Sequence, residues 1–277
     1  MTAEDEWRRL LALVSREFGL VFQDARRGHL ESRLTPRLQA LGLESFGAYH
    51  RYLARHPQRG AELSMLARIL PNNETYFFRE AHHFDLLVQH VVPQLSMPSR
   101  CGPLRVLCAG CSTGDEAYSI VIALQRAGLE RAGLPWQIDA CDLNPECIAQ
   151  ANQGLYEVGS LRACDEPERA AHFCAQGDRF RLRSEHRKGT SFFEANMAVA
   201  GLELPGAPYQ VIFCRNVLIY FCEEAFHRAL SHFHRALDQS GYLFLGHSES
   251  LIGRRSDFQH GFITWSAATR TTTVTYR

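Results

Sequence analysis

The sequence is poor in lysine, in net charge and in long apolar runs. Lys188 is the only lysine among 277 residues, so arginine carries nearly all of the positive charge. Thirty basic and thirty acidic side chains cancel, which removes the electrostatic argument for nucleic acid or an anionic membrane as the main partner. No run reaches the roughly 18 apolar residues that a membrane span requires. We therefore expect neither a nucleic-acid partner nor direct membrane insertion.

The sequence also lacks the marks of a secreted, disulfide-rich protein. Its nine cysteines are odd in number, and the opening MTAEDEWRRL is amphipathic and acidic rather than a signal peptide. We expect a cytoplasmic protein with reduced thiols. Cys108 and Cys111 form a C-x-x-C that suits a redox pair or half a zinc site, but no second C-x-x-C accompanies it. We therefore expect no bound metal.

The first seventy residues have a helical pattern. Leu10, Val14 and Phe18 share one helical face, and a second face is formed by the leucines at 30, 34, 38 and 41. Pro36 lies inside this second pattern, where it should kink or split the helix. Two more helices are predicted before Pro71, so we expect a small all-helical domain over residues 1–71.

After residue 100, apolar strands alternate with amphipathic helices. The predicted strands are LRVLCAG, WQIDACD, YQVIFCR and GYLFLGH, and FITWSA with TTTVTYR would close the sheet as an antiparallel pair. This alternation is typical of a mostly parallel sheet in an α/β, Rossmann-like domain. Within residues 156–193 we predict a small β-hairpin insertion made of RFRLRS and TSFFEA, either functional or decorative. The predicted sheet domain covers 100–277, and 72–99 is predicted to be a linker with a helix.

Gly110 and Gly114 flank a turn between the first predicted strand and a helix. At this place in a doubly wound sheet, glycines let the backbone approach a ligand and helix N–H groups bind an anion. Asp142 ends the next strand, where a carboxylate can accept hydrogen bonds from both hydroxyls of a ribose. The spacing from Gly114 to Asp142 exceeds that of the dinucleotide fingerprint. An adenosine cofactor with a different anionic end, S-adenosylmethionine, fits best.

Two further stretches place polar side chains near the carboxyl edge of the sheet. PNNETYFFRE joins the helical region to the sheet and carries Arg79, whereas FCRNVLIYF ends a strand with Arg215, Asn216 and Tyr220. Ligands of open α/β sheets bind at this edge. We predict functional roles for these polar residues, while the neighbouring phenylalanines are more typical of a core.

Four ordered segments resemble the signatures of one family. NNETYFFRE, CSTGDEAYSI, FCRNVLIYF and GYLFLGHSES are similar to those of the chemotaxis receptor methyltransferases, the CheR-type protein-glutamate O-methyltransferases. The resemblance implies a class I methyltransferase domain behind a helical domain that engages the receptor. It implies that Arg79 and Tyr220 aid transfer. It also implies cofactor contacts at Asn73, Thr75, Arg79, Glu116, Asp142, Asn196, Met197, Arg215 and Asn216.

The resemblance implies transfer of a methyl group from S-adenosylmethionine to glutamate carboxylates in the cytoplasmic helical region of transmembrane chemoreceptors. The products would be glutamate methyl esters and S-adenosylhomocysteine. Arg26, Arg33 and Arg37 form a stripe on the second helix that is either a solvated face or a surface for an acidic receptor helix.

The predicted insertion is a few residues shorter than in family members that tether to a receptor's C-terminal peptide. We therefore expect an enzyme that works without this tether, and a monomer. The alternatives are a methyltransferase acting on RNA or a small molecule, and a non-catalytic cofactor-binding module. The module would be expected to lose Arg79 or Tyr220, and both are present.

Overall fold

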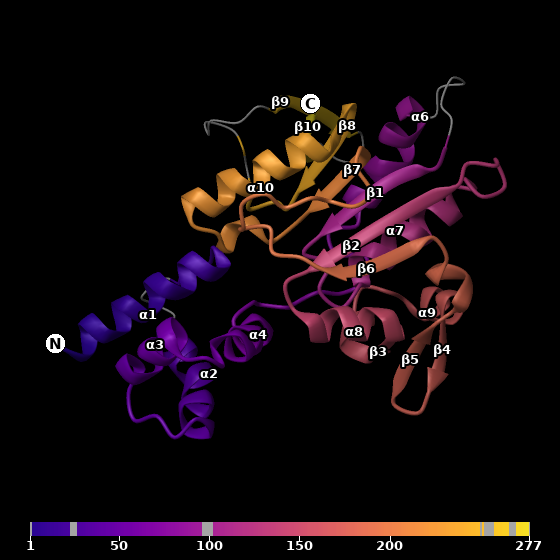
Figure 1. The fold of residues 1–277 in the computed structure, drawn as a ribbon. Helices are drawn as coiled ribbons and strands as arrows, with labels where there is room; N and C mark the ends of the chain where they lie inside the picture. Colours follow the sequence, from indigo (N-terminus) through magenta and orange to yellow (C-terminus); the bar gives the residue numbers. More distant parts are fainter. Residues whose placement is uncertain are drawn as a thin grey trace.

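A small helical domain stands against a larger domain built on one twisted sheet (Figure 1). The computed structural model describes residues 2–22, 27–95, 102–249, 251, 258–265 and 270–276, with the backbone alone from 259 onward. Among these residues, no helix has the length and apolar character needed to cross a bilayer.

The helical domain has its own apolar core, as the leucine spacing predicts. Thr2 caps its first helix through a reciprocal pair of hydrogen bonds with Asp5, and Gly19 ends that helix with a φ of 72°. Trp7, Leu10 and Leu34 are buried where the helices meet. Its helices, within the described residues, are α1 (Ala3–Phe18), α2 (Arg27–Ala40), α3 (Phe46–Arg55) and α4 (Arg59–Ile69).

Pro36 was predicted to kink or split its helix, and the split is wrong, because α2 continues through this position. Proline inside a helix costs about 3 kcal/mol or more. Leu34 and Leu38, on either side of Pro36, are 0% and 7% exposed, so burial on both sides holds the helix together.

The main sheet has seven strands in the order β6-β2-β1-β7-β8-β10-β9. The strands from β6 to β8 are parallel, and β10 runs antiparallel to both β8 and β9. The predicted parallel sheet with an antiparallel edge is therefore confirmed. The strands are β1 (Leu104–Ala109), β2 (Trp136–Asp142), β6 (Thr190–Glu194), β7 (Tyr209–Cys214), β8 (Leu237–Leu245), β9 (Gln259–Trp265) and β10 (Arg270–Tyr276).

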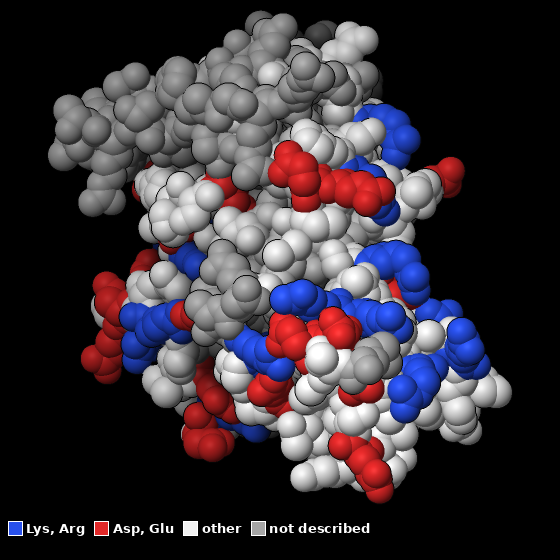
Figure 2. Space-filling view, turned by 90° about the vertical axis from the view of Figure 1, so that its left-hand side faces the viewer, with Lys and Arg blue, Asp and Glu red and all other residues white. Residues whose placement is uncertain are grey.

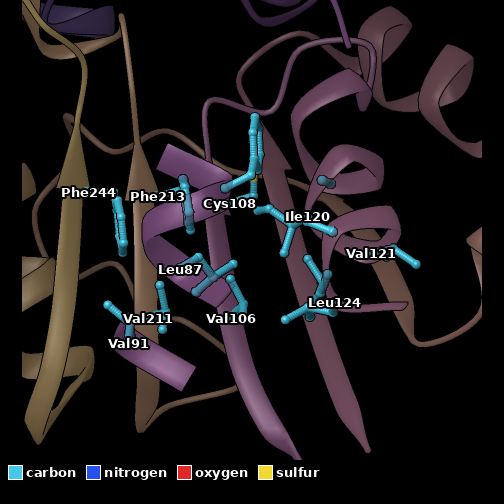
Figure 3. Close-up of a cluster of buried hydrophobic side chains, with 14 of the residues drawn as sticks. Leu87, Val91, Val106, Cys108, Ile120, Val121, Leu124, Val211, Phe213 and Phe244 are labelled. Carbon is cyan, nitrogen blue, oxygen red and sulfur yellow. The ribbon is translucent and has the colours of Figure 1, made fainter. Parts of the chain in front are cut away.

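Helices bury both faces of this sheet, and strand β1 supplies alternate side chains to each face. Val106 and Cys108 pack on the face covered by α7, together with side chains from β7 and β8 (Figure 3). Leu107 and Ala109 point to the other face, which α10 covers. The covering helices are α7 (Asp115–Arg126), α10 (Glu223–Ala236), and a helical run made of α5 (His82–Leu86), η2 (Leu87–Val91) and α6 (Val92–Leu95). Helix α8 (Pro145–Gln153) lies against β2 and β6.

The insertion is present, but its predicted second strand belongs elsewhere. TSFFEA forms β6, which pairs in parallel with β2 in the main sheet, because Phe192 packs on one face and Phe193 on the other. The insertion is a separate three-stranded antiparallel sheet in the order β3-β5-β4. It consists of β3 (Leu155–Glu157), η3 (Val158–Leu161), α9 (Glu166–His172), β4 (Phe173–Gln176), β5 (Arg179–Leu182) and η4 (Ser184–Arg187).

The end of α1 joins the helical domain to the sheet domain through backbone pairing. Leu20 forms an antiparallel bridge with Phe221. The N–H of Val21 donates to the carbonyl of Tyr220 at 2.8 Å, and the N–H of Cys222 donates to the carbonyl of Gly19 at 2.8 Å. The helical domain therefore lies at the carboxyl edge of the strands, directly beside the turn that carries Tyr220.

Candidate active site

A cavity of about 730 Å³ lies between the two domains at the carboxyl edge of the sheet. Side chains from α1, α2, the segment before α5 and the loops after β1, β2, β6 and β7 line it. The structure brings together nearly all of the predicted cofactor and catalytic residues. Those on the cavity wall are Asn73, Thr75, Arg79, Gly110, Glu116, Asp142, Asn196, Met197, Arg215, Asn216 and Tyr220.

Gly114 is a predicted site residue that does not line the cavity. It precedes α7 with a φ of 88°, and an added Cβ would lie 2.8 Å from the Cβ of Ala151. Gly114 therefore lets α7 begin close to α8, whereas Gly110, with a φ of 80°, reaches the cavity wall beside Val217.

Asp142 ties the glycine turn to the end of β2. Its Oδ2 accepts from the backbone N–H of Ser112 at 2.8 Å, and its Oδ1 accepts from that of Asn144 at 2.9 Å. The Ser112 hydroxyl donates in turn to the carbonyl of Asn73 at 3.0 Å. Burial raises the pKa of Asp142, and the backbone N–H donors oppose that rise. Asp142 thus shapes the turn besides facing the cavity.

The two cysteines of the C-x-x-C lie in the apolar core on one face of the sheet. Both are buried, and burial raises the pKa of each thiol well above its usual value. The thiol of Cys108 donates to Oε1 of Glu116 at 3.0 Å. Within the described part of the chain, no group of three or more His, Cys, Asp or Glu side chains could hold a metal ion.

Arg215 lies at the centre of a charged network that forms part of the cavity wall. It is 5% exposed, and its guanidinium lies 2.9 Å from a Glu116 carboxylate oxygen and 3.3 Å from one of Glu80. It also donates to the carbonyl of Arg79 at 2.5 Å. Burial alone would raise the pKa of Glu80, but Arg215 and then His247 outweigh it and lower the pKa to about 2. Arg215 therefore holds the backbone of Arg79 and the carboxylate of Glu116 in place at the same time.

Arg79 occupies a stretch of unusual backbone. Its neighbours Phe78 and Glu80 have φ values of 57° and 54°, in the left-handed region that non-glycine residues seldom adopt. Its guanidinium donates to the carbonyl of Glu74 at 2.9 Å and lies 5.9 Å from the ring centroid of Tyr76. This backbone keeps the Arg79 side chain on the cavity wall.

Tyr220 and Asn196 connect the cavity to its surroundings in different ways. The hydroxyl of Tyr220 accepts from Nδ2 of Asn72 at 3.1 Å. Nδ2 of Asn196 donates to the carbonyl of Glu17 at 3.1 Å, and its Oδ1 accepts from the N–H of Ala198 at 2.9 Å. Asn196 therefore links the loop after β6 to helix α1 as well as facing the cavity.

The predicted arginine stripe is not uniform. Arg33 lines the cavity and donates to the carbonyl of Leu70 at 3.2 Å. Arg37 makes a bidentate ion pair with Glu62, at 3.0 and 2.6 Å, and Glu62 is 4% exposed. Arg26 lies outside the described residues. On the face shown in Figure 2, acidic and basic side chains are interspersed.

Two comparisons of the sequence identify the family. The family model of the CheR methyltransferase SAM binding domain matches residues 73–267, and that of the CheR methyltransferase all-alpha domain matches residues 5–69. The chain belongs to the CheR methyltransferase family. It is 35% identical to the chemotaxis protein methyltransferase of Salmonella typhimurium over 261 residues, 92% of this chain and 87% of that one. Its identity to the chemotaxis protein methyltransferase of Escherichia coli K12 is 34% over 253 residues, 90% and 85% of the two chains.

S-Adenosylmethionine is the cofactor of this CheR-family methyltransferase, and the cavity fits it. The volume of about 730 Å³ lies within the range of small-molecule pockets. The walls offer carboxylates at Glu116 and Asp142 for ammonium and hydroxyl groups, and a guanidinium at Arg79 for a carboxylate. The charges and donors on the wall thus match the groups of this molecule.

Sequence reasoning missed three supporting residues that lie within or beside the motifs. Glu80 pairs with Arg215, Asn72 donates to Tyr220, and Glu249 accepts from the backbone that follows β7. Asn72 and Glu80 stand in NNETYFFRE and Glu249 stands in GYLFLGHSES, so the motifs contain all three. No spacing rule indicates their roles, because each acts on a partner more than 30 residues away along the chain.

Proposed function

We propose that this CheR-family enzyme transfers the methyl group of S-adenosylmethionine to glutamate carboxylates of chemoreceptors and forms glutamate methyl esters. The observation that carries the proposal is the cavity, which residues of both domains line. Arg79 and Tyr220 stand on the wall that Asp142 and Asn216 share. A protein acceptor that the helical domain binds can therefore reach the site where the cofactor lies. The chemotaxis relatives support a receptor as this acceptor.

The residues on the wall divide into two groups by their chemistry. Asp142 would hold the ribose hydroxyls, while Asn73, Thr75, Glu116, Asn196, Met197, Arg215 and Asn216 would complete the cofactor site. When bound, the cofactor supplies a methyl group on a sulfonium, which is already activated for transfer. A glutamate carboxylate, with a usual pKa of about 4.3, is ionised at neutral pH, so the acceptor needs no general base. The protein's task is alignment and the exclusion of water.

Tyr220 and Arg79 are suited to orient the acceptor. Because the Tyr220 oxygen accepts from Asn72, its own hydrogen can be donated to an acceptor oxygen. Arg79 uses a donor on the carbonyl of Glu74 and keeps others of its five N–H groups for ligands. A guanidinium that bound both acceptor oxygens would quench the nucleophile, so Arg79 orients the cofactor or only one acceptor oxygen.

The proposal is tested with tritiated-methyl S-adenosylmethionine and membranes that contain candidate receptors. We expect base-labile label on a receptor band, because glutamate methyl esters hydrolyse in base. Arg79→Gln should abolish most of the label, whereas Arg68→Gln should keep it, because the half-buried Arg68 pairs with Glu146 and does not line the cavity. Label that is stable to base, or label on RNA or a small molecule, would refute the proposed acceptor.

We also propose that the enzyme needs no receptor tether, that it is a monomer and that the arginine stripe binds the receptor. A receptor that lacks its C-terminal peptide should be labelled as well as the full receptor, if the enzyme needs no tether. Sedimentation should give a monomer. Arg33→Ala, beside the cavity, should raise the KM for receptor if the arginine stripe binds it.

A further inference from the structure

The loop after β8 places a buried carboxylate against the turn that follows β7. Glu249 is 7% exposed. Its Oε1 accepts from the backbone N–H groups of Val217, Leu218 and Ile219 at 2.8, 2.6 and 3.3 Å. Its Oε2 accepts from those of Asn216 and Gly246 at 2.6 and 2.8 Å. One carboxylate thus satisfies four consecutive N–H groups of the turn.

This turn needs such a partner. Asn216 has a φ of 60°, in the left-handed region that non-glycine residues seldom adopt and that asparagine tolerates better than most. Successive N–H groups that converge on one point form a concave site for an anion. If no acceptor stood there, several N–H groups would be buried without a hydrogen bond. The Glu249 carboxylate therefore determines the conformation of the turn.

The same turn forms part of the cavity wall. Asn216, Val217, Ile219 and Tyr220 all line the cavity. Gly246 packs tightly against both the turn and the carboxylate. A Cβ added at Gly246 would lie 2.8 Å from Nδ2 of Asn216 and 2.9 Å from Oε2 of Glu249. The turn and the carboxylate are packed as one unit.

We propose that Glu249 is a positioning residue that sets cofactor affinity by holding Asn216 and Tyr220 on the cavity wall. It does not line the cavity itself, and it acts through the backbone of the turn. The inference rests on the proposed place of Asn216 in the cofactor site. It does not depend on which acceptor is methylated.

The test is the binding of S-adenosylhomocysteine to the purified full chain by calorimetry. Glu249→Gln keeps the shape but turns an NH₂ group toward backbone N–H donors, so we expect the Kd to rise about tenfold. Asp139→Asn is the matched control. Asp139 is 6% exposed and accepts from Arg105, Ser191 and Tyr209, away from the cavity. Its Kd should stay within about twofold of the parent value.

Two more variants keep the inference open to refutation. Glu249→Asp restores the charge at shorter reach, so its Kd should lie between those of the parent and Glu249→Gln. Gly246→Ala crowds the contact between Asn216 and Glu249 and should raise the Kd severalfold even if Glu249→Gln fails to fold. The idea is overturned by an unchanged Kd in the folded variants, by equal losses in Asp139→Asn, or by an Asp variant no better than Gln.

Discussion

Asp115, the first residue of α7, carries a buried carboxyl whose ionisation should oppose folding. It is 0% exposed, and the Thr113 hydroxyl donates to its Oδ2 at 2.6 Å. Its Oδ1 has no hydrogen-bond partner among the described residues. Burial raises its pKa from 3.8 to about 6, although the Thr113 hydrogen bond opposes the rise. The native state therefore binds a proton more tightly than the unfolded chain does.

The magnitude follows from this pKa. A rise from 3.8 to about 6 corresponds to about 3 kcal/mol of stability that is present at low pH and lost as pH rises through about 6. Between pH 5 and pH 7 the loss is about 1 kcal/mol, because part of it has already occurred by pH 5. Asp115→Asn cannot ionise, and its amide oxygen can still accept from Thr113. The free energy of unfolding of the variant should therefore gain about 1 kcal/mol on the parent over this interval.

The assay is urea unfolding followed by circular dichroism at pH 5, 6 and 7 and constant ionic strength. His83 and His172, whose pKa values burial lowers to about 3 and about 4, give the opposite slope. They are present in both proteins, so they cancel in the difference. Asp178→Asn, at the exposed end of the β4–β5 hairpin, should run parallel to the parent. If Asp115→Asn also runs parallel to the parent, the burial argument fails.

Three further predictions concern binding, packing and pH. Asp142→Ala should raise the Kd for S-adenosylhomocysteine about tenfold by calorimetry, and parent affinity would rule out the ribose assignment. Glu62→Gln should lower the free energy of unfolding by about 3 kcal/mol in a urea titration, because it breaks the buried ion pair with Arg37. The control is Arg59→Gln, which removes a half-exposed ion pair with Glu17 and should cost about 1 kcal/mol or less. The neutral form of His172 stabilises the insertion above pH 6.5, and this stability should be lost as pH falls toward about 4. The protection factors of β4 and β5 amides, which correct for the slower intrinsic exchange at low pH, should then fall in the parent and fall less in His172→Gln, which keeps the buried His186; equal falls would contradict the assignment.

The order of the elements and the edge of the sheet at which the cavity lies could be predicted from the sequence. A strand that is buried on both faces appears in the sequence as a continuous run of apolar residues. The runs LRVLCAG and YQVIFCR therefore predicted β1 and β7. Gly110 and Asp142 were recognised because turn chemistry and strand ends are local features of the chain. Their placement on one cavity wall followed from the rule that parallel strands end at a common edge.

The errors have a common physical origin. TSFFEA has the same alternation whether it pairs with a hairpin neighbour or with β2, and only burial of Phe192 and Phe193 on opposite faces decides between them. A split at Pro36 was one of the two effects predicted there, because a local window does not show the packing of Leu34 and Leu38. Tertiary packing outweighed local propensity in both places.

The sequence by itself determined the class of fold, the family and the residues that we propose for the cofactor site, because periodicity, turn chemistry and motifs are local features of the chain. Only the tertiary structure decided how those residues are held. Glu80 pairs with Arg215, and Glu249 accepts from the backbone of the turn at Asn216. These contacts join segments far apart in the chain, and their strength comes from burial, which removes the competing water and exists only after folding.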